Sequence, residues 1–252
     1  AFAMSTKFTY FGGMAVLVER SDGYKILCDP YISKNPATDV DVKELYDVDL
    51  VLVTHAAFDH YGDTADIIKN SNAILMAGAD VIRLVNQELD EPLPAERVKS
   101  TIYGDEQSFG TTKVHTAVTF HTSNTVQNGV STVFFPFGFV VEVEPGVTYY
   151  HAGDTCLFSD MKLIHELYKP NVMAVGISRI EPQFPCEMAP REAAHATAMI
   201  GADVVIPTHY APGSEDLELY LRYADAIAPN TQVFAGANRS FLYTPFRVDA
   251  LS

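Results

Sequence analysis

The residues of this chain that could do chemistry begin where an apolar run ends, in residues 51–63, VLVTHAAFDHYGD. The polar turn that closes the run holds His55, Asp59 and His60. Imidazole nitrogens and carboxylate oxygens are ligands that Zn²⁺ and Mn²⁺ take in proteins, and a catalytic site keeps one position open for water. The motif therefore predicts a metal site, with a conspicuous gap at Ala57.

Three further residues of the same chemical types occur later in the chain. His121 closes the run TTKVHTAVTFH, Asp154 lies in YYHAGDT, and His209 follows VVIPT. Each comes at the end of a strand-like run, and turns that follow buried strands can converge on one point. We therefore expect one set of residues around a divalent metal: His55, Asp59, His60, His121, Asp154 and His209.

Each of these residues also has an ordinary structural interpretation. The histidines of the first motif, taken singly, are compatible with hydrogen-bonded residues in a turn. Asp154 could cap the helix that follows it, and His121 could bond to a neighbouring hydroxyl group. The joint occurrence of the six residues is what favours metal binding. His115 is a weaker candidate, and two histidines inside predicted helices are expected at the surface or in packing: His165 and His195.

The elements that must position these residues follow from the periodicity of the apolar residues. Strands are expected near residues 7–12, 14–19, 24–28, 50–54, 73–76, 112–121, 131–143, 147–151, 171–176, 203–207 and 231–235. Helices are expected near residues 64–70, 79–89, 158–168, 190–201 and 215–227. Pro190 fits a first helical position, and Asp63 with Asp66 resembles a capping pair. No low-complexity linker divides the chain, so we expect one domain of the α/β class over residues 1–252.

The composition restricts the classes of partner that are expected for the protein. The chain has 252 residues, 48% of them apolar, and a formal net charge of -15, so a polynucleotide backbone would be repelled and nucleic acid is not expected as a partner. The cysteines form no CxxC pair, which favours a reducing compartment, and we expect a cytoplasmic protein. No window approaches the ~18 apolar residues that a membrane span requires, and the first residues do not resemble a signal peptide, so no membrane partner is expected.

Over nearly its whole length the chain resembles the metallo-β-lactamase-fold hydrolases, and among them the uncharacterised metal-dependent hydrolases related to the ascorbate-6-phosphate lactonases. The resemblance rests on segments that occur in family order: FGGMAVLVE, ILCDP, VTHAAFDHYGD, FHTS, YYHAGDTCLFSDMKLI, MAPREAA and IPTHY. It implies a four-layered αβ/βα sandwich, in which two β-sheets pack face to face between outer helices. The metal centre of such a fold lies at one edge of the sheets.

The resemblance also implies which ligand serves which metal. The family pattern H-x-H-x-D-H places Ala57 where the second histidine is expected, and it makes Asp154 the carboxylate shared by both metals. The second metal site is then complete: Asp59, His60, Asp154 and His209. The first metal site keeps three ligands: His55, His121 and the shared Asp154.

A second departure from the family pattern concerns the amino-terminal segment. The family reads Gly-His-Ala or Gly-His-Ser where this chain has Gly12, Gly13 and Met14, so another histidine is absent. Either one metal works at the complete site, or water, substrate or an unusual ligand completes the other site. Cys186 and Glu187 are the candidates for that ligand, although Cys186 is equally a loop thiol without a role. We expect one or two divalent metals per chain, Zn²⁺ or Mn²⁺ first, with Fe and Ni as alternatives.

The chemistry of such a site predicts hydrolysis by a metal-activated water. Asp59 could bind the metal and also orient the water or accept its proton, and His151 is a second catalytic candidate for proton transfer. Asp29, in the ILCDP turn, matches the family's acidic residue beneath the metal centre, or it simply stabilises that turn. The expected substrate is a small ester or lactone. The alternatives are a catalytically impaired metal-binding sensor and, less favoured, a phosphodiesterase; a homo-oligomer is compatible with the sequence.

Overall fold

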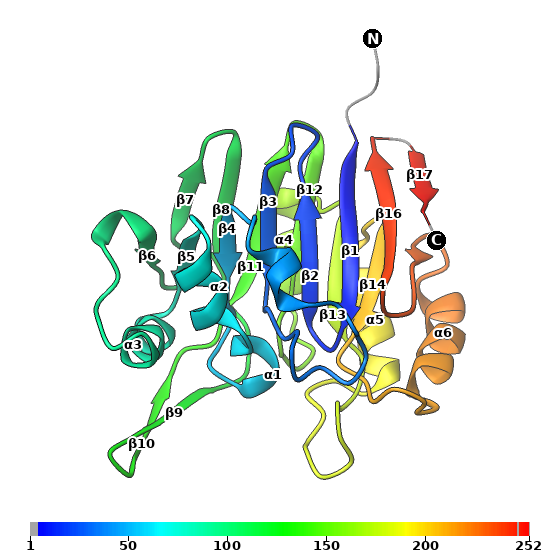
Figure 1. The fold of residues 1–252 in the computed structure, drawn as a ribbon. Coiled ribbons are helices and arrows are strands. Elements are labelled where there is room, and N and C mark those ends of the chain that lie inside the picture. Colours follow the sequence, from blue (N-terminus) through cyan, green and yellow to red (C-terminus); the bar gives the residue numbers. More distant parts are fainter. Residues whose placement is uncertain (1–4, 246, 252) are drawn as a thin grey trace. The chain divides into compact units, whose positions relative to one another are not determined.

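Two parts of the chain are each built around their own β-sheet, as the ribbon in Figure 1 shows. The computed structural model describes residues 5–245 and 247–251. Unit 1 comprises residues 1–103, 122–137 and 237–252, and unit 2 comprises residues 104–121 and 138–236. The expectation of one domain over the whole chain stays a prediction.

Unit 1 contains a mixed sheet whose later strands are parallel. Its strands lie in the order β17 (Arg247–Ala250), β16 (Arg239–Thr244), β1 (Thr6–Gly12), β2 (Ala15–Glu19), β3 (Lys25–Cys28), β4 (Leu50–Leu52), β5 (Ile74–Ala77) and β6 (Val98–Ser100). The strands from β3 to β6 are parallel neighbours. Because the carboxyl ends of parallel strands meet at one edge of a sheet, the turn after β3 and the turn after β4 lie side by side.

The helices of unit 1 pack on this sheet through apolar side chains. They are α1 (Phe58–Tyr61), α2 (Thr64–Asn70) and α3 (Ala79–Glu88), with two 3-10 helices, η1 (Val42–Leu45) and η2 (Ala95–Arg97). Ile67 and Ile68 of α2 and Val81 and Val85 of α3 are almost completely buried in one cluster with the sheet residue Leu75. Burial of this kind is the main force that holds such short helices in place. A hairpin of two strands, β9 (Ser123–Gln127) and β10 (Val130–Phe134), completes the unit.

Unit 2 contains the second sheet. Its strands lie in the order β15 (Gln232–Val233), β14 (Val204–Thr208), β13 (Val172–Gly176), β12 (Val147–His151), β11 (Gly138–Glu144), β8 (Thr112–Ala117) and β7 (Glu106–Phe109). The strands from β12 to β15 are parallel. Its helices are α4 (Met161–Tyr168), α5 (Pro190–Ile200) and α6 (Asp216–Ile227), which bury residues such as Met161, Ala193 and Tyr220 in a second core.

Most predicted elements are present, with informative differences. Pro190 is the first residue of α5, as predicted. The run at residues 131–143 is not one strand, because it is divided between β10 and β11 around Pro136, whose ring cannot donate to a sheet ladder. The strand expected at residues 112–121 ends at Ala117, which leaves His121 in a loop.

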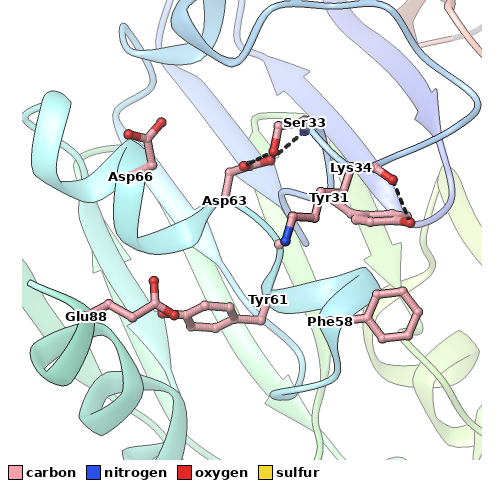
Figure 2. Close-up of a pocket in the computed structure, with 9 residues that line it drawn as sticks. Tyr31, Ser33, Lys34, Phe58, Tyr61, Asp63, Asp66 and Glu88 are labelled. Atoms are coloured by element: carbon pink, nitrogen blue, oxygen red, sulfur yellow. Dashed lines mark hydrogen bonds between the residues drawn. The ribbon is translucent and has the colours of Figure 1, made fainter.

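The predicted capping pair at the start of α2 is wrong. The Asp63 side chain makes no cap hydrogen bond to α2. Its carboxylate accepts instead from the backbone N–H groups of Ile32, at 3.0 Å, and Ser33, at 2.8 Å (Figure 2). Asp63 thus fixes the loop after β3 to the start of α2. The two segments line a cavity of about 330 Å³ in unit 1, to which Phe58 and Tyr61 of α1 contribute aromatic rings.

Candidate metal centre

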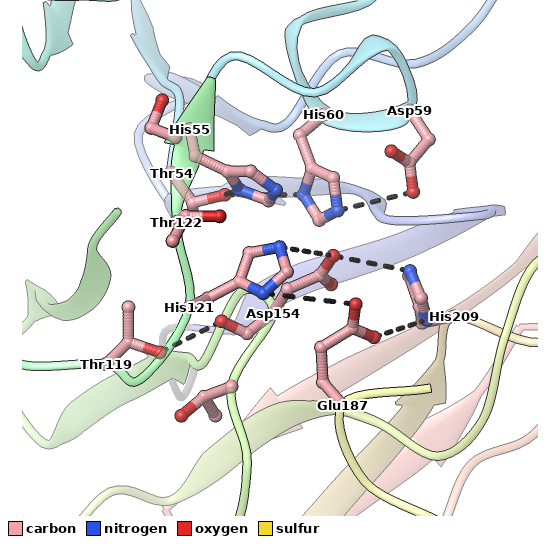
Figure 3. Close-up of polar contacts among 12 residues, drawn as sticks. Thr54, His55, Asp59, His60, Thr119, His121, Thr122, Asp154, Glu187 and His209 are labelled. Atoms are coloured by element: carbon pink, nitrogen blue, oxygen red, sulfur yellow. Dashed lines mark hydrogen bonds and ion pairs between the residues drawn. The ribbon is translucent and has the colours of Figure 1, made fainter. Parts of the chain in front are cut away.

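The residues of the first motif lie in unit 1, at the carboxyl end of β4 and in the single turn of α1. His55 follows β4, and Asp59 and His60 belong to α1. All three side chains are withdrawn from solvent, with 1%, 4% and 0% of their surface exposed. The His55 and His60 rings are 4.1 Å apart between centroids, and Asp59 Oδ2 lies 3.3 Å from His60 Nε2. Figure 3 shows these three side chains beside one another.

The Asp29 carboxylate supports this group of side chains through hydrogen bonds. Its carboxylate, fully buried at the end of β3, accepts from the Thr54 backbone N–H at 2.8 Å and from the Thr54 hydroxyl at 2.9 Å. The other contact of the carboxylate is His60 Nδ1, at 2.9 Å. A carboxylate can only accept, so Nδ1 of His60 carries the proton in this contact. A metal-binding histidine is commonly oriented by such a carboxylate, as the predicted role of Asp29 requires.

Thr54 was not among the predicted site residues, yet it connects the group. Besides its bonds to Asp29, its hydroxyl oxygen lies 3.0 Å from His55 Nδ1 and 3.3 Å from His60 Nδ1. Both Nδ1 atoms are therefore on the side of the Thr54 hydroxyl. Its position immediately before His55 was the signal available in the sequence.

The two positions where the family's histidines are missing differ in their surroundings. Ala57 precedes α1 and is only half-buried. Gly13 has a positive φ of 55°, and a Cβ atom there would lie 2.8 Å from a ring carbon of Tyr31. The Tyr31 ring is held by Phe58, with which it makes an edge contact at 5.9 Å, and by the hydrogen bond from its hydroxyl to the Lys34 carbonyl. A side chain at position 13 therefore has no room unless Tyr31 moves.

The later candidates lie in unit 2, in loops after its strands. His121 is in the loop after β8, Asp154 follows β12 and His209 follows β14. Asp154 can present an oxygen within 4.8 Å of a nitrogen of His121 and of His209. Its Oδ2 is 3.8 Å from His121 Nε2 and 3.4 Å from His209 Nε2 (Figure 3). The carboxylate predicted to be shared between two metals is thus in contact with both histidines of its own unit.

Glu187 joins this group from the loop before α5. Its carboxylate oxygens lie 4.0 Å from His121 Nδ1 and 3.5 Å from His209 Nδ1. Asp154 therefore meets the Nε2 atoms of the two rings, and Glu187 meets their Nδ1 atoms. This arrangement favours Glu187 as a support that orients both histidines over a replacement for the missing ligand.

Backbone geometry brings His209 into this position. Its Nδ1 donates to the Ser178 carbonyl at 2.6 Å, which leaves Nε2 on the side of Asp154. His209 itself has a positive φ of 57°. Gly176 ends the neighbouring strand β13, and a Cβ atom there would lie 3.3 Å from the Cβ atom of His209. Because glycine has no Cβ atom, Gly176 leaves room for the His209 side chain close to the end of β13.

The other predicted residues have different surroundings. His151 is fully buried at the end of β12, and its Nδ1 lies 2.7 Å from the Tyr149 hydroxyl. Cys186 accepts from the Arg179 guanidinium at 3.5 Å. Burial raises the pKa of the Cys28 thiol, next to Asp29, well above its usual value, so this thiol stays protonated.

The weaker histidine candidates serve structural contacts. His115 pairs with Glu142 across the sheet of unit 2, at 2.7 Å, and rests on the Tyr168 ring. His165 bonds through Nδ1 to the Ile200 carbonyl, and His195 is exposed on α5. The two helical histidines are therefore packing and surface residues, as expected.

The donor atoms of each unit fit a divalent metal. In both groups the side-chain contacts join imidazole to carboxylate, which is the ligand chemistry of Zn²⁺ and Mn²⁺ sites. Asp59 and Asp154 are each only 4% exposed, and buried carboxylates are costly unless they are paired or bound to a cation. Burial also raises the pKa of the Tyr210 phenol beside His209, so this side chain stays neutral and adds no charge.

Comparison with known proteins defines the class to which this fold and these ligands belong. The beta-lactamase superfamily domain matches residues 24–210. The solved structure of a metallo hydrolase from Ignicoccus hospitalis is similar with a TM-score of 0.78 and 25% identity, over 95% of this chain and 98% of that chain. A metallo-beta-lactamase fold protein from Bacillus subtilis has a TM-score of 0.69 and 14% identity, over 95% of this chain and 100% of that one. The predicted α/β fold of metallo-β-lactamase type is confirmed.

A curated relative defines the family more closely. A UPF0173 metal-dependent hydrolase from Rubrobacter xylanophilus is 35% identical over 227 residues, which cover 86% of this chain and 89% of the relative. The chain therefore belongs to the UPF0173 metal-dependent hydrolases, and it is a metal-dependent hydrolase of the β-lactamase superfamily. Among the residues that the structure describes, no helix has both the length and the apolar character needed to cross a bilayer.

Proposed function

We propose that this protein hydrolyses a small ester or lactone with the help of a divalent metal bound by the predicted ligands. The observation that carries this proposal is the repeated arrangement of buried histidines against a buried carboxylate, once in each unit. Zn²⁺ and Mn²⁺ are the preferred metals, because nitrogen and carboxylate ligands suit both. When bound, such a cation lowers the pKa of a coordinated water to about 7 and stabilises the negative charge that develops on the substrate.

The residues of the chain have distinct tasks in this proposal. Asp29 and Thr54 hold the imidazole rings of unit 1 through their Nδ1 atoms. In unit 2, Ser178 and Glu187 hold the His209 ring through its Nδ1 atom. Asp59, buried beside His60, is the proposed acceptor of a proton from the attacking water. His151, hydrogen-bonded to Tyr149, is proposed to take part in proton transfer to or from this region.

The substrate class is argued from charge and size. A chain with a net charge of -15 repels polynucleotides, so a small molecule is the proposed partner and a phosphodiester polymer is disfavoured. The resemblance to the ascorbate-6-phosphate lactonases supports a lactone or another small ester. The scaffold alone does not select a substrate, because one fold hosts many activities.

Metal content and hydrolysis, measured on the same preparations, test the proposal. Protein purified without chelator should contain one or two Zn²⁺ or Mn²⁺ ions per chain by elemental analysis. It should hydrolyse members of a panel of esters, lactones and phosphodiesters only when metal is present. The variants His60→Gln and His209→Gln should each lose more metal affinity than the roughly 10–100-fold expected for a residue that only supports a ligand.

His195→Gln is the matched control, because His195 is exposed on α5 and lies outside both groups. It should keep wild-type metal content and activity. Metal content near zero in the wild type, or full metal content in the His60 and His209 variants, would contradict the proposed ligands. Hydrolysis of phosphodiesters alone would contradict the substrate class.

A second candidate function is a metal-binding sensor without hydrolytic activity. Ala57 and Gly13, which stand where the family's histidines are expected, favour it. Ala57→His should raise the metal content toward two ions per chain, because it supplies the histidine that the family pattern has at this position. If the folded variant still binds the same amount of metal as the wild type, the missing histidine at position 57 does not limit metal binding at the first site. A sensor would bind metal and hydrolyse no member of the panel.

The compartment is a further part of the proposal. The cysteines Cys28, Cys156 and Cys186 are free thiols. Thiols of this kind persist where the environment is reducing, which supports a cytoplasmic protein. Fractionation of the source cells should recover it with cytoplasmic enzymes, and recovery from a secreted fraction would contradict this.

A further inference from the structure

The backbone around His55 is held on both sides by residues of one later segment of the chain. On the amino-terminal side, the Phe137 backbone N–H donates to the Thr54 carbonyl at 2.9 Å. On the carboxyl-terminal side, the Ala56 backbone N–H donates to the Ser123 hydroxyl oxygen, also at 2.9 Å. All of these residues belong to unit 1. The two peptide groups that flank His55 therefore each have a hydrogen-bond partner from that segment.

Holding both peptide groups has a direct consequence for the His55 side chain. Because peptide groups are planar, the conformation of a residue depends on two angles only, φ and ψ. The orientations of the peptide groups before and after His55 set these two angles, so the two hydrogen bonds restrict the direction of its Cα–Cβ bond. The Thr54 hydroxyl lies 3.0 Å from Nδ1 of the ring. The contacts of the backbone and of the ring together restrict where Nε2 of His55 can lie.

Ser123 makes its contact through a side chain, and the Asp80 carboxylate fixes the direction of that contact. Ser123 is fully buried, and its hydroxyl group donates to Asp80 Oδ2 at 2.5 Å. A hydroxyl group has a single proton, and a carboxylate can only accept. The proton of Ser123 is therefore used in the bond to Asp80, and the oxygen is left to accept from the Ala56 N–H.

Asp80 is buried at a place where acidic residues are usually exposed. It lies in the first turn of α3, where the helix dipole favours a negative charge. It is nevertheless only 1% exposed, and within residues 5–245 and 247–251 its Oδ1 has no hydrogen-bond partner. Gly78 leaves room for it, because a Cβ atom there would lie 2.9 Å from this oxygen. Burial of a carboxylate is costly, so stabilisation of the helix, which an exposed carboxylate would provide equally, does not account for it.

We propose that Ser123, held by Asp80, is a positioning residue that fixes His55 for metal binding. This role rests on the proposed function, because it takes His55 as a metal ligand. The same hydrogen bonds attach β9 to the rest of unit 1, but attachment alone requires neither a buried carboxylate nor a contact beside His55. The first metal site has few ligands, since Ala57 stands where the family pattern has a histidine, so the position of each remaining ligand has a larger effect on affinity.

The test compares Ser123→Ala with Thr125→Val in the full-length protein. Thr125 lies on the same face of β9 and is 4% exposed, and its hydroxyl group has no hydrogen-bond partner in the described part of the chain. Thr125→Val therefore removes a buried hydroxyl group without removing the bond to Ala56. In the metal-free protein, NMR should show roughly tenfold faster hydrogen exchange of the Ala56 amide in Ser123→Ala. Zn²⁺ affinity, from competition with a chelator, should fall about 10–100-fold in the same variant. Thr125→Val should match the wild type in both measurements.

A second background separates positioning from a general loss of stability. If Ser123 acts through His55, Ser123→Ala should cause no further loss of Zn²⁺ affinity in a protein that already carries His55→Gln. Circular dichroism checks that the variants are folded. If Ser123→Ala is not, Asp80→Ala frees the hydroxyl proton of Ser123 and should lower the Zn²⁺ affinity in the same direction.

The outcomes distinguish this role from the proposed function. Unchanged exchange of the Ala56 amide or unchanged Zn²⁺ affinity in the folded variants overturns the role of Ser123 alone. An equal loss in Thr125→Val, or the full loss repeated in the His55→Gln protein, does the same. A wild type that binds neither Zn²⁺ nor Mn²⁺ overturns the proposed function, and the role of Ser123 with it.

Discussion

Among single residues, Asp29 allows the effect of supporting a metal ligand to be measured apart from the effect of binding the metal. It is fully buried, bonds to His60 Nδ1 and belongs to unit 1 together with the histidine that it orients. Asp29→Asn keeps the size of the side chain and one acceptor oxygen but loses the negative charge beside the imidazole. We expect metal affinity to fall about 10–100-fold, measured by competition with a chelator of known affinity.

Asp22→Asn provides the control for this measurement. Asp22 is an exposed carboxylate whose pKa is lowered to about 2, mainly by its hydrogen bond from Arg20. Removing its charge changes the net charge of the protein by the same amount as the Asp29 variant, at a position outside the predicted site. Equal metal affinity in the two variants would show that Asp29 acts only through the net charge or not at all.

At the scale of elements, the end of β13 sets how closely His209 can approach. Gly176→Ala places a Cβ atom 3.3 Å from the His209 Cβ atom, so the strand end or the loop must shift by a few tenths of an ångström. We expect a loss of about 1–2 kcal/mol in the free energy of unfolding, from urea denaturation, together with weaker metal binding.

Gly138→Ala is a matched substitution in the same sheet. A Cβ atom at Gly138 would also approach a neighbour to 3.3 Å, but that neighbour is the carbonyl oxygen of Ala152. Stability should fall by a similar amount while metal affinity remains that of the wild type. If Gly176→Ala loses stability and keeps its metal affinity, the spacing between β13 and His209 does not matter for the metal.

The elements that carry the ligands were largely predictable, and the exceptions have physical causes. Apolar runs indicated β4, β12 and β14, which precede His55, Asp154 and His209. The helix α1 was not predicted, because one turn is too short to show a helical period. The division of residues 131–143 between two sheets was also missed, because both parts are apolar and only Pro136 marks the break.

For the whole molecule, metal binding and stability are linked if the ligands are those we propose. A metal at 100 times its dissociation constant stabilises the folded state by about 2.7 kcal/mol, and the melting temperature of a protein of this size rises by roughly 2–4 °C per kcal/mol. We therefore expect added Zn²⁺ or Mn²⁺ to raise the melting temperature of the chelator-treated protein by roughly 5–10 °C, measured by calorimetry.

Variants of the proposed ligands test whether this stabilisation arises at the predicted residues. The variant with His60→Gln and His209→Gln should show no shift. A shift in this double variant equal to that of the wild type would contradict the proposed ligands.

The association of residues that are distant in sequence was the least predictable feature of the molecule. Motif order and the family resemblance indicated the ligand set. The contacts of Thr54 and Glu187 with their histidines depend instead on the course of the chain at a strand end and in a long loop. Nothing in the local sequence reveals that Glu187 meets the Nδ1 side of two imidazoles. The division into two units built from interleaved segments is likewise a property of tertiary contacts.

The Tyr31 ring beside Gly13 has an evolutionary consequence. A Cβ atom at position 13 would lie 2.8 Å from the Tyr31 ring, so a side chain fits at position 13 only when residue 31 changes as well. Positions 13 and 31 are therefore expected to change together during evolution.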